Sequence, residues 1–259
     1  MIFDTHAHYD DEAFDPDRDS LLASMPASGI HRIINACASA GSLDILPGLM
    51  EQWPFMYGAA GIHPDDAHLV TPDILQKIRD LASHPKTAAI GEIGLDYYWH
   101  KTEEEHRLQK TVFRLQMDLA REANLPFMVH SRDAAADTLS IVREYMDKGM
   151  AGGVIHCFSY SWEIAQQYLD MGLYLGIGGV VTYKNGRRLK EVVQKAPLSR
   201  LLLETDCPYL SPVPYRGKRN SSLNLPLVAE TIAELKGTTK EEVIKATWEN
   251  ARRIYPKAA

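Results

Sequence analysis

Short apolar runs alternate along this chain with longer stretches of helical periodicity, and this alternation limits its fold more than any other feature. Eight runs are predicted as strands: Ile2–His6, Arg32–Ala36, Met56–Gly61, Thr87–Gly91, Pro126–His130, Gly153–His156, Tyr174–Gly178 and Leu201–Glu204. Helices are predicted between and after them, at Asp17–Ser28, Ser42–Gln52, Thr71–Ser83, Glu103–Ala123, Asp133–Lys148, Trp162–Met171, Arg187–Ala196, Leu223–Lys236 and Thr239–Ile254. Eight strands that each lead into a helix predict an α/β fold, a (β/α)8 TIM-type barrel.

The main alternative for such an alternation is a doubly wound open sheet. That fold uses a glycine-rich phosphate-binding turn after its first strand. Here the first predicted strand leads into His6-Ala7-His8, which favours the barrel. No repeat, low-complexity tract or Pro/Gly/Ser-rich linker divides the 259 residues, so we expect residues 1–259 to form a single domain.

Composition and charge exclude several classes of protein. No apolar run is long enough to span a bilayer, and four of the first twelve residues are acidic where a signal segment would be basic and then apolar. The three cysteines are widely spaced without a CxxC pair, which suits reduced thiols. We therefore expect a cytoplasmic protein. The net charge of −6 argues against a broad nucleic-acid-coating surface, although it permits a basic mouth around a local site.

Metal-competent side chains fall repeatedly at the carboxyl ends of the predicted strands. His6 and His8 end the first strand, and they point to the same side because side chains alternate along a strand. Later strands end in or near His63, Glu92, His130, His156, Glu204 and Asp206. In a barrel these ends meet on one rim, which is the face that carries active sites in this fold.

Each of these side chains also has a structural explanation when it is taken alone, because a single histidine or carboxylate at a strand end is commonly hydrogen-bonded within the fold. A buried cluster of them without a cation carries a heavy desolvation cost, so we predict a metal site. The predicted ligands are His6, His8, Glu92, His130, His156 and Asp206. They exceed the needs of one tetrahedral ion and favour two bridged ions, with Glu92 as the bridge.

Six ordered motifs resemble the TatD family of metal-dependent deoxyribonucleases, within the amidohydrolase superfamily. They are DTHAH from Asp4, GIHP from Gly61, GEIGLDY from Gly91, PFMVHSR from Pro126, HCFS from His156 and ETDCPYL from Glu204. A basic segment, Arg216–Asn220, stands where that family has a basic loop. The similarity runs in the family's order from residue 2 to about residue 220. Ala7 and Cys207, beside the ligands, replace residues that many members have as Cys and Ala.

The resemblance implies a barrel that hydrolyses DNA phosphodiester bonds, as a 3′-to-5′ exonuclease that uses divalent metal ions. DNA, single-stranded or at a 3′ end, is the implied partner. From the sequence itself we expect no membrane and no obligate protein partner. By position, the resemblance implies that one ion is held by His6, His8, Glu92 and Asp206, and the other by Glu92, His130 and His156. It also implies that His63 contacts the substrate phosphate.

For the chemistry we expect a metal-activated water to attack phosphorus. Asp206, a carboxylate at the ion and on the rim, is the candidate base that takes the proton, and Glu92 is its catalytic partner. His63 and Arg216 are expected to neutralise the phosphate, with Arg132 as a weaker candidate for the same role.

Several neighbouring residues have two interpretations that the sequence leaves open. Glu204 either takes part in catalysis or orients a ligand from behind. Lys218, Arg219 and the Arg187-Arg188 pair either track nucleic acid or form a solvated charged surface. Tyr97–Trp99 either stack on a terminal base or pack beneath their own loop.

Two rival functions remain. Another amidohydrolase would act on a small ester, amide, lactone or phosphotriester; many of these bridge two metals with a carbamylated lysine after strand four, whereas no lysine lies between Thr87 and Tyr98. A silent binding protein would typically lack a ligand, and none is missing here. The sequence does not decide among magnesium, manganese and zinc, or between DNA and RNA.

Overall fold

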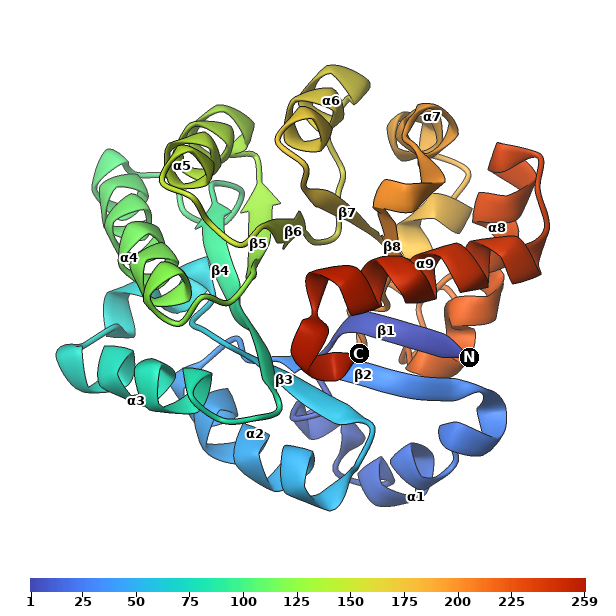
Figure 1. Ribbon diagram of the computed structural model, residues 1–259, viewed down its shortest axis with the longest axis horizontal. Helices are drawn as coiled ribbons and strands as arrows, with labels where there is room; N and C mark the ends of the chain where they lie inside the picture. Colours follow the sequence, from blue (N-terminus) through green and yellow to red (C-terminus); the bar gives the residue numbers. More distant parts are fainter.

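A ring of eight parallel strands forms the centre of the molecule, and helices surround it (Figure 1). The computed structural model describes residues 1–259. The strands are β1 (Ile2–Ala7), β2 (Ile30–Ala36), β3 (Met56–Ala60), β4 (Thr87–Asp96), β5 (Phe127–Arg132), β6 (Gly153–Ile155), β7 (Tyr174–Ile177) and β8 (Leu201–Leu203). The α-helices are α1 (Arg18–Ala23), α2 (Ala40–Gln52), α3 (Pro72–Ala82), α4 (Glu103–Glu122), α5 (Ala135–Asp147), α6 (Trp162–Asp170), α7 (Arg187–Lys195), α8 (Leu225–Lys236) and α9 (Lys240–Ile254). The prediction of a single (β/α)8 barrel is confirmed.

The first and last strands close the ring at their carboxyl ends. Ala7 pairs with Cys207 in an isolated parallel bridge, and the His8 amide donates to the Cys207 carbonyl at 2.8 Å. The Asp206 amide donates to the His6 carbonyl at 3.0 Å. The closure therefore brings together two segments that lie about 200 residues apart in the sequence.

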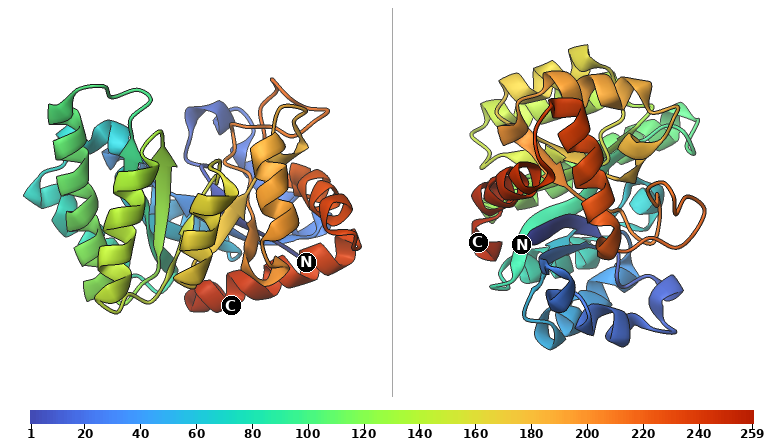
Figure 2. Two further views of the ribbon diagram at one scale, coloured as in Figure 1. Left: turned by 90° about the horizontal axis from the view of Figure 1, so that it is seen from above. Right: turned by 90° about the vertical axis from the view of Figure 1, so that its right-hand side faces the viewer.

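Helix α9 crosses the amino end of the barrel and covers it (Figure 2). Its Ala251 and Ile254, together with the following Tyr255, join a buried cluster that includes Phe3 of β1 and Leu202 of β8. Both chain termini lie at this end, away from the long loop between β8 and α8 (Figure 2). The carboxyl ends of the strands are therefore left free to carry a site.

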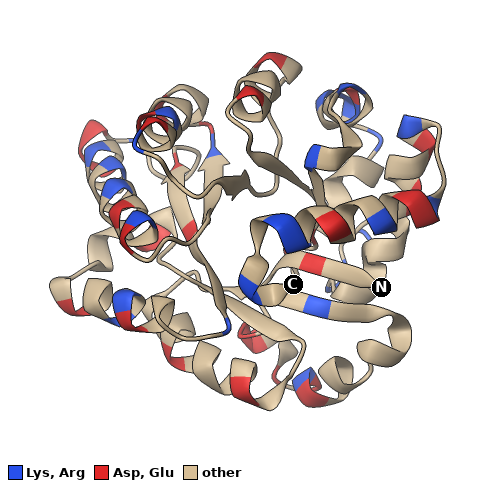
Figure 3. Ribbon diagram, in the orientation of Figure 1, with Lys and Arg blue, Asp and Glu red and all other residues tan.

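The outer helices are amphipathic. Helix α4 buries Val112, Phe113, Met117 and Ala120, a spacing that forms one apolar face toward the strands. Lysine, arginine, aspartate and glutamate are interspersed on the outward sides of the helices, whereas the strands carry few of them (Figure 3). None of the helices combines the length and the apolar character that a membrane crossing requires.

Most predicted elements agree with the observed ones to within two residues at each end, and two differ by more. Helix α1 ends at Ala23 and a 3-10 turn follows at Pro26–Ser28, because a proline has no N–H to continue the helical hydrogen bonds. Strand β4 continues past Gly91 to Asp96, so Glu92 lies inside the strand. A side chain at Gly94, where φ is +145°, would collide with the carbonyl oxygen of His130 in β5. The glycine is thus required for close pairing of the two strands.

Candidate metal centre

The carboxyl ends of the strands open into a pocket of about 970 Å³. Five of the six predicted ligands line it, and His6 lies completely buried beside them. The segments that follow β1, β2, β3, β4 and β8 form the walls, with Asp10, Asp11, Glu12, Ser39, Ser42, His63, Asp65, Trp99 and Tyr209. The structure therefore brings all six predicted ligands to one place.

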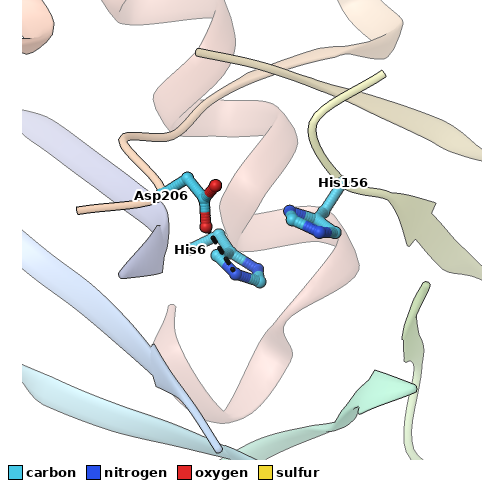
Figure 4. Close-up of side chains that lie close together, drawn as sticks. All are labelled: His6, His156 and Asp206. Atoms are coloured by element: carbon cyan, nitrogen blue, oxygen red, sulfur yellow. Dashed lines mark ion pairs between the residues drawn. The ribbon is translucent and has the colours of Figure 1, made fainter. Parts of the chain in front are cut away.

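One group of donor atoms gathers at the end of β1. His6 Nε2 lies 2.9 Å from His8 Nε2, and both nitrogens face Glu92 Oε2, at 3.3 and 3.5 Å. Asp206 Oδ1 lies 3.3 Å from His8 Nε2 and 3.5 Å from His6 Nε2; Figure 4 marks the second of these pairs. Donors that each lie about 2.1 Å from one divalent ion are about 3.0–3.5 Å apart. The spacing of these four side chains fits a single ion.

A second group faces the other oxygen of the same glutamate. Glu92 Oε1 lies 2.9 Å from His130 Nδ1 and 2.7 Å from His156 Nε2. The two nitrogens are 3.3 Å apart. The His156 ring also stacks on His6 at a centroid distance of 3.9 Å, so the two groups are contiguous. Glu92 thus divides its two oxygens between two sets of imidazoles.

In His8 and His130, the outer ring nitrogen, which faces away from the cluster, shows that the inner nitrogen, which faces the cluster, carries the lone pair. His8 Nδ1 lies 2.8 Å from the carbonyl oxygen of Ala36, and His130 Nε2 lies 3.2 Å from Asp96 Oδ2. Because each acceptor requires a proton on the outer nitrogen, the inner nitrogen of the neutral ring presents its lone pair. Such lone pairs, directed at two carboxylates, repel one another unless protons or cations lie between them. The donor set therefore fits divalent metal ions.

Charges within the cluster shift its pKa values in opposite directions. Burial lowers the pKa of His6 to about 4, and the neighbouring His156 reinforces the effect, so this ring is neutral. Burial also lowers the pKa of His8, but the Asp206 hydrogen bond and the charge of Glu92 outweigh it and raise the value to about 10. Burial raises the pKa of Glu92, yet the surrounding histidines bring it well below its usual range. The carboxylates thus stabilise positive charge on the neighbouring histidines. A divalent metal ion would supply that charge in place of the protons.

Two carboxylates support the ligands from behind. Glu204 is buried, with Oε1 at 3.8 Å from His156 Nδ1, and the same oxygen accepts a hydrogen bond from the Cys157 amide. Asp96 Oδ2 lies 3.2 Å from His130 Nε2, and no functional role was predicted for this residue from the sequence. Its signal was present, because it lies four residues after Glu92 and residues at that spacing share one face of a strand.

Comparison with known proteins identifies the family. A family model described as "TatD related DNase" matches residues 3–256. The chain belongs to the TatD-related DNase family. It is 44% identical over 255 residues to the uncharacterized metal-dependent hydrolase YabD of Bacillus subtilis, covering 98% of this chain and 99% of that protein. It is 34% identical over 266 residues to the protein named 3′-5′ ssDNA/RNA exonuclease TatD of Cronobacter turicensis, covering 100% and 99%.

A solved structure agrees with this assignment. The crystal structure of YjjV, a TatD homolog from Escherichia coli K12, superposes with a TM-score of 0.91 and 27% identity, covering 98% of both chains. The resemblance inferred from the motifs is confirmed, and this TatD-family chain is a metal-dependent hydrolase.

The residues expected to bind substrate occupy different places in this TatD-family fold. His63 is in the pocket, with Nε2 at 3.6 Å from Glu92 Oε1, and its Nδ1 accepts the Asp65 amide at 3.2 Å. The proton of the neutral ring is therefore on Nε2, facing the cluster. Arg132 lines the pocket wall. Arg216 is outside the residues that line the pocket, with its guanidinium carbon 4.6 Å from the centroid of the Tyr183 ring.

Arg219 and Tyr97, whose roles the sequence left open, form contacts within the protein. Arg219 forms a two-fold ion pair with Asp17, at 2.6 and 2.7 Å. The hydroxyl of Tyr97 donates to Asp137 at 2.7 Å, and its ring stacks on His106 at 3.6 Å. Tyr97 therefore packs beneath its loop.

Proposed function

We propose that this chain hydrolyses phosphodiester bonds of nucleic acid as a 3′-to-5′ exodeoxyribonuclease that uses two divalent metal ions. The observation that carries the proposal is the position of the Glu92 carboxylate between two groups of histidines. Its Oε2 faces His6 and His8, whereas its Oε1 faces His130 and His156. Two ions about 3.5–4 Å apart that share a carboxylate suit displacement at phosphorus. The Cronobacter relative, whose name specifies a 3′-5′ ssDNA/RNA exonuclease, supports this choice of substrate.

The proposed ligands are His6, His8, Glu92 and Asp206 for one ion, and Glu92, His130 and His156 for the other. The bound ions, magnesium, manganese or zinc, supply Lewis acidity and lower the pKa of water. Asp206 is the proposed base because it is the more accessible carboxylate, with 17% of its side chain exposed against 4% for Glu92. It takes the proton of the attacking water from the pocket side.

The phosphate is proposed to meet His63 first. The N–H on its Nε2 points toward the cluster and donates to a phosphoryl oxygen, while Arg132 on the wall supplies a positive charge. Arg216, exposed on the loop after β8, is proposed to contact a more distant phosphate of the same strand.

The test is degradation of an end-labelled oligonucleotide. Chelated protein is supplied with magnesium, manganese or zinc in turn and given a 5′-labelled single strand; a ladder that shortens stepwise from the 3′ end is expected. Glu92→Gln, which removes the bridging charge, is the inactive control. Hydrolysis of small esters, lactones or phosphotriesters with an intact oligonucleotide would overturn the proposal in favour of the rival amidohydrolase chemistry.

A further inference from the structure

Two exposed aromatic side chains stand on the walls of the pocket. Trp99 is 65% exposed and Tyr209 is 56% exposed, and both line the cavity. Large aromatic rings are normally buried, so two open rings beside one site indicate a ligand that covers them. Stacking on a base is one of the two interpretations that the sequence left open for Trp99, and Tyr209 has no role in the site described so far.

The topology places the two rings on opposite walls. Trp99 lies on the loop after β4 and Tyr209 on the loop after β8. These strands are four places apart in a ring of eight, and Figure 1 shows them on opposite sides of the barrel. The ligands of the metal centre lie at the strand ends between them.

The backbone of Trp99 is fixed by a hydrogen bond within the protein. Its amide donates to Asp96 Oδ1 at 3.0 Å, so the carboxylate that supports His130 also fixes this loop. The Tyr98 ring packs edge-on against Trp99, with centroids 4.7 Å apart. The guanidinium carbon of Arg132 lies 3.9 Å from the Tyr98 centroid and 5.7 Å from that of Trp99. Arg132 therefore places a positive charge beside the Trp99 ring.

Tyr209 is held through both its hydroxyl and its backbone, and its neighbours are negatively charged. Its hydroxyl donates to Asp11 Oδ2 at 2.8 Å, and its amide donates to the carbonyl of Asp206 at 2.9 Å. Asn220 Nδ2 donates to its carbonyl at 2.9 Å. Asp10 and Asp11 line the same pocket, so this wall repels a continuing phosphate chain.

We propose that Trp99 and Tyr209 are stacking surfaces for the two nucleobases that flank the scissile phosphate. The inference rests on the proposed nuclease function and specifies its substrate as unpaired strands, because a base within a duplex has both faces covered. Tyr209, on the acidic wall, holds the 3′-terminal base, and Trp99, beside Arg132, holds the base before it. Stacking on aromatic rings accepts any base, so degradation is independent of sequence.

The first test measures binding without turnover. Metal-free protein is titrated into a fluorescently labelled oligothymidylate and anisotropy is recorded. Loss of one stacked base, worth about 1–3 kcal/mol, predicts that Trp99→Ala and Tyr209→Ala each weaken binding about 5- to 150-fold. Trp99→Phe and Tyr209→Phe keep a ring and most of the affinity. Tyr215→Ala is the matched control, since Tyr215 is 43% exposed on the same loop as Tyr209 but lies outside the pocket lining. Unchanged affinity in both alanine variants would overturn the proposal.

The second test assigns each ring to a base. Oligonucleotides with an abasic site at the last or at the next-to-last position are degraded by the metal-loaded proteins. Tyr209→Ala is expected to slow cleavage of the normal strand but not of the strand that lacks its last base, and Trp99→Ala to behave likewise at the next-to-last position. The reverse pairing would overturn the assigned direction. Equal cleavage of all strands by the unmodified protein would overturn stacking alone, whereas cleavage of none would reject the nuclease function itself.

Discussion

Asp96 gives the sharpest prediction of how the metal centre depends on hydrogen bonds behind it. Its Oδ1 accepts the amides of Tyr98 and Trp99, at 2.8 and 3.0 Å, and its Oδ2 lies 3.2 Å from His130 Nε2. In Asp96→Asn the single amide oxygen is needed for the two backbone N–H groups, so the side-chain NH2 faces His130. The imidazole must then accept at Nε2 and carry its proton on Nδ1.

That proton occupies the atom that faces Glu92 Oε1, at 2.9 Å. Neutral His130 therefore loses the lone pair with which it would bind a metal ion. Removal of a hydrogen-bond partner behind a ligand typically weakens metal binding about 10- to 100-fold, or roughly 1.4–2.7 kcal/mol. We expect Asp96→Asn to reach the upper end of this range or exceed it. Asp96→Ala, which leaves the tautomer free, should fall at the lower end.

Isothermal titration of metal-free protein with Mn²⁺ measures the effect directly. The unmodified protein should bind two ions, and Asp96→Asn should lose affinity at the His130 site while the ion at His6 and His8 is retained. Glu105→Gln serves as the control, because Glu105 accepts hydrogen bonds from His100 and Thr102 outside the pocket. If Asp96→Asn bound both ions as tightly as the unmodified protein, or more tightly than Asp96→Ala, the tautomer argument would be refuted.

Three further predictions concern catalysis, pH and folding. Asp206→Asn should largely keep its metal content by elemental analysis while turnover falls about 10²- to 10⁴-fold; unchanged turnover would exclude the proposed base. In metal-free protein, burial lowers the pKa of His130 but hydrogen bonds to Asp96 and Glu92 raise it to about 9. The stability that protonated His130 contributes is thus complete below pH ~6.5 and lost as pH rises through 9. Metal affinity rises over the same interval, because the ion displaces that proton. A melting temperature and a metal affinity that did not change with pH over this interval would contradict the prediction. The added methyl group of Gly94→Ala would collide with the His130 carbonyl, so this variant should lower the free energy of unfolding by roughly 2–6 kcal/mol in a denaturant titration. Gly149 also has a positive φ but faces open space, so Gly149→Ala should lower it by only about 1–2 kcal/mol.

The meeting of the six candidate ligands at one place was predictable because their position depends on topology. Parallel strands end on one rim, so His6, His130 and His156 could be placed together once the alternation of strands and helices was recognised. Periodicity, however, treats glycine as a break in a strand, and it ended the fourth strand at Gly91. The glycines are instead required by the close approach of β5, which is a tertiary contact that no local pattern records.

Other details depend on backbone geometry that the sequence does not specify. Asp206 adopts a left-handed conformation, with φ of 56°, that aims its carboxylate at His8 and His6. Residues 204–221 form a long irregular loop, so the distance of Arg216 from the pocket could not be obtained from its position in the chain. Trp99 and Tyr97 are near neighbours in sequence, yet only the structure distinguishes the open ring from the packed one.

The seam between β1 and β8 couples the first proposed metal site to the completion of folding. His6 and His8 are among the first residues to leave the ribosome, whereas Asp206 follows about 200 residues later. Their donor atoms meet only when Ala7 pairs with Cys207 and the ring shuts. A chain that is incomplete, or whose strands pair out of register, therefore has only part of this ligand set. It should bind the ion more weakly than the closed barrel does. A metal ion bound there would stabilise the closed seam, since a ligand that binds only the native state stabilises that state.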